Sequence, residues 1–104
     1  MAAVALGPAV FRAAAAKQPK NTEHLVEIAK FAFTPTELKV RPGDTIIWLN
    51  RDIVPHTATA LDKSWDTDTI ERGKSKSLIV TKKMNQVYYC RFHPKMTANI
   101  TISS

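Results

Sequence analysis

Residues 89–96 decide how this chain is organised, and they read Tyr89-Cys90-Arg91-Phe92-His93-Pro94-Lys95-Met96. This stretch holds the only cysteine of the chain, with one of its three histidines and one of its three methionines. A second histidine lies upstream in Pro55-His56-Thr57. A thiolate, two imidazoles and a thioether are the donors of a mononuclear copper site that transfers electrons. The sequence therefore predicts one metal site built from His56, Cys90, His93 and Met96.

The spacing of these residues suits such a site. Cys90, His93 and Met96 follow one another in steps of three residues. A tight loop leaving a strand can turn such positions towards one point, and Pro94 restricts the backbone of His93. His56 has to come from a different loop. Ligands divided between two loops are held by the fold, which suits a redox site because its ligands then move little when the metal changes charge.

The donor types favour copper over zinc. Structural zinc sites are closed sets of Cys and His, commonly with paired cysteines, whereas this chain has one Cys. Thiolate and thioether suit Cu(I), and imidazole suits copper in both oxidation states. Zinc could still occupy the site in recombinant protein. Taken alone, Cys90 reads as a small buried hydrophobe and Met96 as core filler, so the prediction depends on the four residues occurring together.

Length and charge set the broad class. A chain of 104 residues supports one domain with a modest core. Its formal net charge of +6 could attract nucleic acid, an anionic membrane or an acidic protein, but the basic residues are scattered and no nucleic-acid motif accompanies them. Arg51, Arg91 and Lys95 lie near the candidate ligands and could steer an acidic redox partner. A merely soluble basic surface explains them equally well.

The N-terminal part differs from the rest. Residues 1–16 are apolar and Ala-rich, and Ala14-Ala15-Ala16 forms a small-residue cleavage pattern. We interpret this segment as a shortened signal peptide, with an N-terminal extension packed on the domain as the alternative. It is too short to span a bilayer. Residues 17–24 are expected to be a linker in which His24 is an ordinary surface residue, and residues 25–104 the domain. One cysteine excludes an internal disulfide, so cysteine pairing does not indicate secretion.

From residue 25 onward the signals are those of short strands. Val26 and Ile28 alternate with Glu27, the period of a half-buried strand. The turn at 41–44 precedes a strand at 45–50, which places Trp48 in the core.

Residues 61–72 read as a polar surface connection, and residues 99–103 as the final strand. About seven short strands without an amphipathic helix predict an all-β, two-sheet sandwich.

Successive landmarks of the chain resemble those of the cupredoxins, and among them the amicyanin- and plastocyanin-like blue copper proteins. These landmarks are Arg41-Pro42-Gly43-Asp44-Thr45, Trp48-Leu49-Asn50, Pro55-His56-Thr57 and Cys90 to Met96. The resemblance covers about residues 25–102 and implies a Greek-key β-sandwich of seven to eight strands with one type 1 copper at one end. It implies His56, Cys90 and His93 as equatorial ligands and Met96 as the axial ligand.

The resemblance also implies a function. We expect a small soluble monomer, periplasmic or otherwise extracytoplasmic, that cycles Cu(II) and Cu(I) and carries electrons between larger redox proteins without being an enzyme. A copper storage or delivery protein is the alternative, and an interaction module with structural copper is a third class. His93 would lie at the surface in an apolar patch that includes Pro55, Phe92 and Pro94.

Two positions depart from the family pattern. The backbone N–H of residue 57 is expected to contact the Cys90 sulfur, but Thr57 stands where these relatives usually carry Asn. Thr97-Ala98 stands where a glycine is expected soon after the methionine.

Overall fold

The computed structural model describes residues 21–103, so the prediction of a signal peptide or extension over residues 1–16 lies outside the described part. The described residues form eight strands. In chain order these are β1 (Glu23–Ala29), β2 (Ala32–Thr34), β3 (Glu37–Val40), β4 (Thr45–Asn50), β5 (Thr59–Ala60), β6 (Ser75–Ile79), β7 (Val87–Cys90) and β8 (His93–Ile102).

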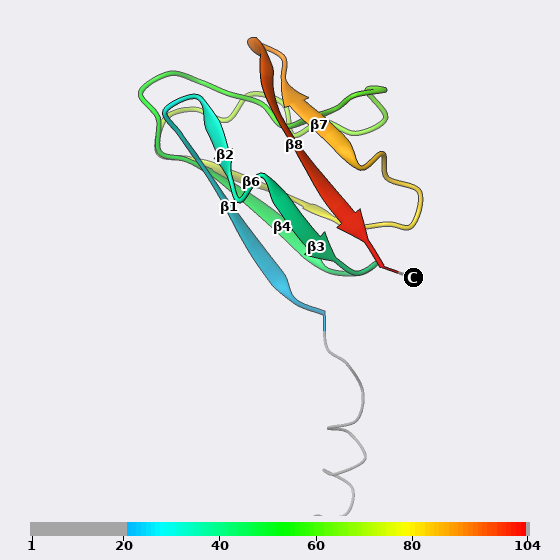
Figure 1. Ribbon diagram of the computed structural model, residues 1–104. Helices are drawn as coiled ribbons and strands as arrows, with labels where there is room; N and C mark the ends of the chain where they lie inside the picture. The colour runs from blue at the N-terminus through cyan, green and yellow to red at the C-terminus, as the bar shows by residue number, and fades with distance from the viewer. Residues whose placement is uncertain (1–20, 104) are drawn as a thin grey trace, which may run out of the picture.

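The strands pack as two four-stranded sheets (Figure 1), with the orders β2-β1-β4-β6 and β3-β8-β7-β5. Both sheets are mixed, because β1 runs parallel to β4 and β3 runs parallel to β8. The predicted all-β, two-sheet sandwich is therefore confirmed. Residues 21–103 contain no helix long and apolar enough to cross a membrane.

Alternating residues of β1 and β4 form the centre of the core. Val26 and Ile28 on β1 and Ile46 and Trp48 on β4 are all inaccessible to solvent, as the period-two pattern predicts. The Trp48 ring meets the Tyr88 ring edge to face, with 5.7 Å between their centroids. This packed interior gives the loops at the ends of the sandwich a rigid base.

The connection over residues 61–72 was predicted to lie on the surface, but part of it is buried in the core. Ile70 is fully buried, and the Trp65 ring packs against Trp48 with 5.7 Å between centroids. Isolated apolar residues in a polar segment have no periodicity, so their burial has no signature in the sequence.

The domain starts earlier than predicted. Strand β1 begins at Glu23, inside the segment expected to be a linker. His24 pairs with Ile46 in the sheet, and its Nε2 atom lies 2.8 Å from the buried carboxylate of Asp44. His24 is therefore part of the fold rather than an ordinary surface residue.

The last strand is also longer than predicted. Strand β8 begins at His93 instead of residue 99. Its buried residues Met96, Ala98 and Ile100 alternate with more accessible ones, so the period-two signal was present before residue 99. Pro94 obscured this signal because proline is rare inside strands, although edges and bulges accept it.

Candidate metal centre

The β1–β2 and β7–β8 turns lie at the same end of the sandwich (Figure 1), and the β7–β8 hairpin carries Cys90 and His93. Cys90 ends β7 and His93 begins β8, and the two residues are cross-strand partners in a hairpin with a register shift beside Cys90. His93 and Met96 thus lie on a strand, where a compact loop was expected. His56 comes from the loop that follows β4.

Asn50 shapes the loop that contains His56. Its buried side-chain amide donates hydrogen bonds to the carbonyl oxygens of Val54, at 2.8 Å, and Ile70, at 2.9 Å. Its Oδ1 atom accepts a hydrogen bond from the backbone N–H of Asp52 at 2.8 Å. The backbone of His56 is held as well, because it exchanges two hydrogen bonds with Ile70. The position of His56 is therefore fixed by the protein itself.

His56 and Cys90 lie in contact and are fully buried. The Nδ1 atom of His56 is 3.6 Å from the Sγ atom of Cys90. One ion bound tetrahedrally at roughly 2.0 Å from nitrogen and 2.3 Å from sulfur would hold these atoms about 3.5 Å apart. The pair therefore fits a shared metal ion.

Asp52 orients the His56 ring. Its Oδ2 atom lies 2.9 Å from Nε2 of His56. The hydrogen bond with His56, with further bonds from the backbone N–H groups of Phe31 and Ile53, outweighs the effect of burial and lowers the pKa of the Asp52 carboxyl. An ionised carboxylate accepts the Nε2 proton, which leaves the Nδ1 lone pair directed at the sulfur. Sequence reasoning missed Asp52 because an Asp–His pair within a loop follows no periodic pattern.

The Cys90 sulfur accepts a hydrogen bond from the protein backbone. The N–H of Thr57 donates to Cys90 Sγ at 3.3 Å, which is the contact that the resemblance implied. The hydroxyl of Thr57 lies 2.9 Å from the backbone nitrogen of Arg91 and accepts its hydrogen bond. Thr57 therefore connects the two ligand-bearing segments through its backbone and its side chain.

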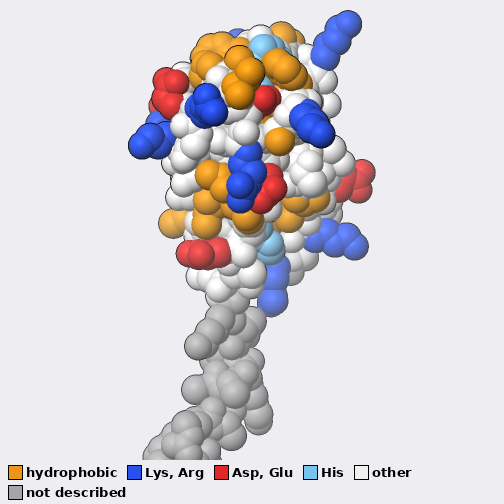
Figure 2. Space-filling model, turned by 90° about the vertical axis from the view of Figure 1, so that its left-hand side faces the viewer, with side chains coloured by type: hydrophobic (Ala, Val, Ile, Leu, Met, Phe, Trp, Pro, Cys, Tyr) orange, Lys and Arg blue, Asp and Glu red, His pale blue; other side chains and the backbone are white. Residues whose placement is uncertain are grey.

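An exposed aromatic residue covers the two histidines. The Phe31 ring lies edge-on to His93, with 4.9 Å between centroids, and to His56, with 5.7 Å between centroids. Phe31 lies in the β1–β2 turn at a positive φ of 59°, and it is half exposed. Ile53 and Phe92 are also exposed, and Figure 2 shows hydrophobic side chains around a histidine at this end of the molecule. Phe31, in contact with His93, extends the apolar patch beyond its predicted members.

The four candidate ligands are assembled to different degrees. The His56 and His93 ring centroids are 5.1 Å apart. Met96 is buried in the core cluster that contains Cys90. Within residues 21–103, no group of three or more His, Cys, Asp or Glu side chains already has the arrangement of a metal site. The structure thus joins His56 to Cys90 and places the His93 ring next to the His56 ring.

Two of the basic residues near the site are engaged in ion pairs. Arg51 Nε lies 3.1 Å from a carboxylate oxygen of Glu27, and Arg91 Nε lies 2.9 Å from Asp66. Within the described part of the chain, Lys95 forms no ion pair. The charge available to an acidic partner is therefore smaller than the sequence suggests.

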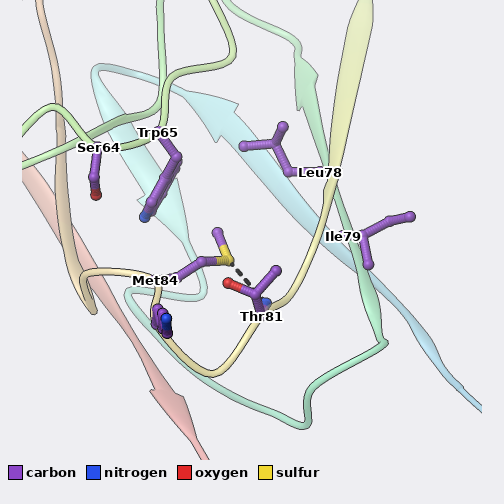
Figure 3. Close-up of a pocket in the computed structure, with 7 residues that line it drawn as sticks. Ser64, Trp65, Leu78, Ile79, Thr81 and Met84 are labelled. Atoms are coloured by element: carbon purple, nitrogen blue, oxygen red, sulfur yellow. Dashed lines mark hydrogen bonds between the residues drawn. The ribbon is translucent and has the colours of Figure 1, made fainter.

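A separate apolar groove of about 330 Å³ lies between β6 and the connection that follows β5 (Figure 3). Trp65, Leu78 and Met84 line it, and the backbone N–H of Thr81 donates to the Met84 sulfur at 3.3 Å. None of the four candidate ligands lines this groove.

Comparisons with known proteins agree with this geometry. Residues 20–103 match the family described as copper binding proteins, plastocyanin/azurin family. Amicyanin from Paracoccus denitrificans is 28% identical over 83 residues, a match that spans 75% of this chain and 63% of that protein.

Solved structures give the same result. An oxidised amicyanin with a methionine-to-leucine substitution superposes with a TM-score of 0.70 at 26% identity, covering 77% of this chain and 81% of the other. A purple cupredoxin from Nitrosopumilus maritimus shares the fold, with a TM-score of 0.69 at 23% identity, covering 77% of this chain and 99% of that one. The chain therefore belongs to the copper-binding plastocyanin/azurin family of cupredoxins.

Proposed function

We propose that this protein is a small type 1 copper electron carrier. His56, Cys90 and His93 would be the equatorial ligands and Met96 the weak axial ligand, a donor set typical of blue copper sites. The observation that carries the proposal is the 3.6 Å contact between His56 Nδ1 and Cys90 Sγ in a chain of a copper-binding family. Bound copper would supply the one-electron couple between Cu(II) and Cu(I).

The surrounding residues suit electron transfer. Asp52 and Thr57 hold His56 and Cys90 through hydrogen bonds, and fixed ligands change little when the metal changes charge. His93 is partly accessible beside the exposed Phe31 ring, which makes it a suitable exit for an electron at an apolar contact surface. We infer that larger redox proteins dock there as donor and acceptor, and that Lys95 favours partners with acidic surfaces.

Other properties follow from the same proposal. Four protein donors leave no open coordination position for a substrate, so we propose a carrier rather than an enzyme. We also propose a monomer with one copper per chain in a periplasmic or other extracytoplasmic compartment.

The experiment is a redox cycle of the copper-loaded protein. Reduction followed by reoxidation should bleach and restore the visible absorption with one electron per copper. Line broadening in the proton NMR spectrum of mixtures of the reduced and oxidised protein should reveal electron exchange that is faster than loss of the metal. Irreversible bleaching, or metal loss at each cycle, would contradict the proposal.

Copper storage or delivery is a second candidate, because the thiolate of Cys90 and the thioether of Met96 are donors that suit Cu(I). Transfer of Cu(I) to a chelating acceptor distinguishes the candidates. A delivery protein should transfer its ion faster than it exchanges electrons, and a carrier should do the reverse.

A further inference from the structure

The hydroxyl of Thr57 belongs to a hydrogen-bond network that runs from the metal site to the surface. Thr57 is fully buried. Its Oγ1 atom accepts a hydrogen bond at 2.9 Å from the backbone N–H of Arg91, the residue that follows Cys90 in sequence. The same atom lies 3.0 Å from Oγ1 of Thr59. A threonine at this position therefore connects the sulfur-bearing strand with the segment that follows His56.

The network continues to Asp66. Thr59 and Asp66 form an isolated antiparallel bridge. Burial disfavours ionisation of Asp66, but hydrogen bonds from the Asp68 backbone and from the Arg91 and Thr59 side chains outweigh it and lower the pKa of its carboxyl. Because an ionised carboxylate only accepts hydrogen bonds, we assign the Thr59 hydroxyl as a donor to Asp66, its partner in the bridge. The Thr59 oxygen is then left to accept the proton of the Thr57 hydroxyl.

Arg91 closes the network into a ring. Its backbone N–H donates to Thr57, and its side-chain Nε lies 2.9 Å from Oδ2 of Asp66. Arg91 thus donates at both ends of the network, through its backbone N–H to Thr57 and through its side chain to Asp66. Hydrogen bonds arranged head to tail, as from the Arg91 N–H through Thr57 and Thr59 to Asp66, polarise one another and hold the segments that they join in one arrangement.

We propose that Thr57, Thr59, Asp66 and Arg91 act together as a positioning network that fixes the Cys90 segment against the His56 segment and thereby sets the reduction potential of the copper site. The effect on the reduction potential rests on the proposed function. The effect on the position of the Cys90 segment does not, because it needs no bound copper. The network acts through the Thr57 N–H bond to the Cys90 sulfur. Such a bond withdraws electron density from the sulfur and favours the reduced form.

The test uses Thr57→Val, Thr57→Ser, Thr59→Val and Asp66→Asn. Valine keeps the shape of threonine without the hydroxyl, and serine keeps the hydroxyl. Asp68→Asn is the matched control, because Asp68 lies 3.8 Å from the same guanidinium but is not bridged to Thr59. Two quantities are measured for each variant. The first is the hydrogen-exchange rate of the Arg91 amide in metal-free protein, and the second is the Cu(I):Cu(II) ratio of copper-loaded protein in a fixed redox buffer.

Thr57→Val should speed exchange of the Arg91 amide by about tenfold and lower the Cu(I):Cu(II) ratio by roughly 2- to 10-fold, as expected for loss of one buried hydrogen bond. Thr59→Val and Asp66→Asn should shift both quantities in the same direction. Thr57→Ser and Asp68→Asn should leave them within about twofold of the parent values, a change smaller than one hydrogen bond contributes.

Unchanged exchange and unchanged ratio in Thr57→Val and Asp66→Asn would overturn the proposal, as would an equal effect of Asp68→Asn. Asp66 is partly exposed, so its variant decides the matter even if Thr57→Val does not fold. If copper forms no thiolate complex, the proposed function fails. The exchange rate of the Arg91 amide in the metal-free protein still reports on the network in that case.

Discussion

Asp52 holds the His56 ring in the orientation that the proposed copper site requires. Its carboxylate lies 2.9 Å from Nε2 on the side of the ring away from the Cys90 sulfur. Such a partner fixes the tautomer and the orientation of a ligand histidine and increases its basicity. The same carboxylate accepts the backbone N–H of Phe31 at 3.1 Å, so it also holds the turn that places an aromatic ring over the site.

Replacing Asp52 with Ala should therefore weaken copper binding by about 10- to 100-fold, the range for loss of a partner of this kind. Competition for Cu(II) with a chelator of known affinity measures the effect. Asp62→Ala serves as the control, because Asp62 bonds to Ser64 in an exposed segment. Equal affinities of the Asp52 and Asp62 variants would show that His56 needs no such partner.

Some residues of the site could be predicted from the sequence and others could not. The donor atoms of Cys90, His93, Met96 and His56 are chemically distinctive, so their side chains alone suggested copper. Asp52 and Phe31 are ordinary residues whose roles depend on where a loop and a turn lie in space. No pattern in the sequence carries that information.

Among the elements, the β3–β4 turn joins the start of the domain to its core. Asp44 is almost fully buried there and accepts hydrogen bonds from the backbone N–H groups of Thr22 and Arg41 and from His24. Burial disfavours ionisation of Asp44, but these hydrogen bonds outweigh it and lower the pKa of the carboxyl below 3.8. The ionised form therefore stabilises the folded state.

This arrangement predicts a pH dependence. The stabilisation by Asp44 is complete well above pH 3.8 and is lost as the pH falls through the lower pKa of the folded state. At pH 7, Asp44→Asn should lower the free energy of unfolding of the metal-free protein by about 1–3 kcal/mol. Urea unfolding should show that the difference from the parent shrinks in acid. Glu37→Gln, on exposed β3, is the control, and a difference that is constant with pH would contradict the assignment.

Strand β6 is an edge strand that lies open to a further strand. Lys74 accepts a hydrogen bond from the backbone N–H of Asn50, and Val80 donates its N–H to the carbonyl oxygen of Asp44. The intervening odd-numbered residues therefore direct their backbone groups outward. Lys76 is paired with Trp48 and therefore shares the inner face of the sheet. An inward-pointing charge at an edge discourages pairing with a second chain.

Lys76→Val should therefore promote concentration-dependent association, measured by sedimentation of the metal-free protein. Lys82→Val removes the same charge outside any strand and should leave the sedimentation unchanged. If neither variant associates, Lys76 has no protective role.

Strands with a regular alternation of apolar and polar residues were predicted correctly, whereas an interruption of that alternation led to a wrong strand boundary. Strand β4 was predicted with its observed bounds, because Ile46 and Trp48 alternate with less buried residues. The beginning of β8 was missed because Pro94 is unusual in a strand. The chain could turn directly after Cys90, at Arg91, or only after Met96. Which of the two occurs depends on how β7 pairs with β8, and this pairing is a property of the tertiary structure.

The whole molecule is basic, but its charge near the site is largely neutralised. The net charge is +6, yet Arg51 and Arg91 are paired with Glu27 and Asp66. This leaves Lys30, beside Phe31 in the β1–β2 turn, and Lys95, two residues from His93, as cations at that end that form no ion pair within the described residues. Sequence distance alone could not reveal these pairs, because Asp66 comes from a separate connection.

Lys95→Glu should slow reduction of the copper-loaded protein by a negatively charged redox reagent several-fold at low ionic strength, since charges near the contact act mainly on association rates. Added salt should remove most of the difference. Lys39→Glu changes the net charge equally on β3 and should have a smaller effect. Equal effects of both variants would mean that only the overall charge matters.

The most direct test of the central claim is a titration of metal-free protein with Cu(II), followed by visible absorption, for the parent and for Cys90→Ser. The account predicts an intense thiolate-to-Cu(II) band that saturates at one equivalent in the parent and is absent from the variant, with the far-ultraviolet circular dichroism of a β-sandwich retained in both. A band that persists in Cys90→Ser, or none in correctly folded parent protein, would contradict it.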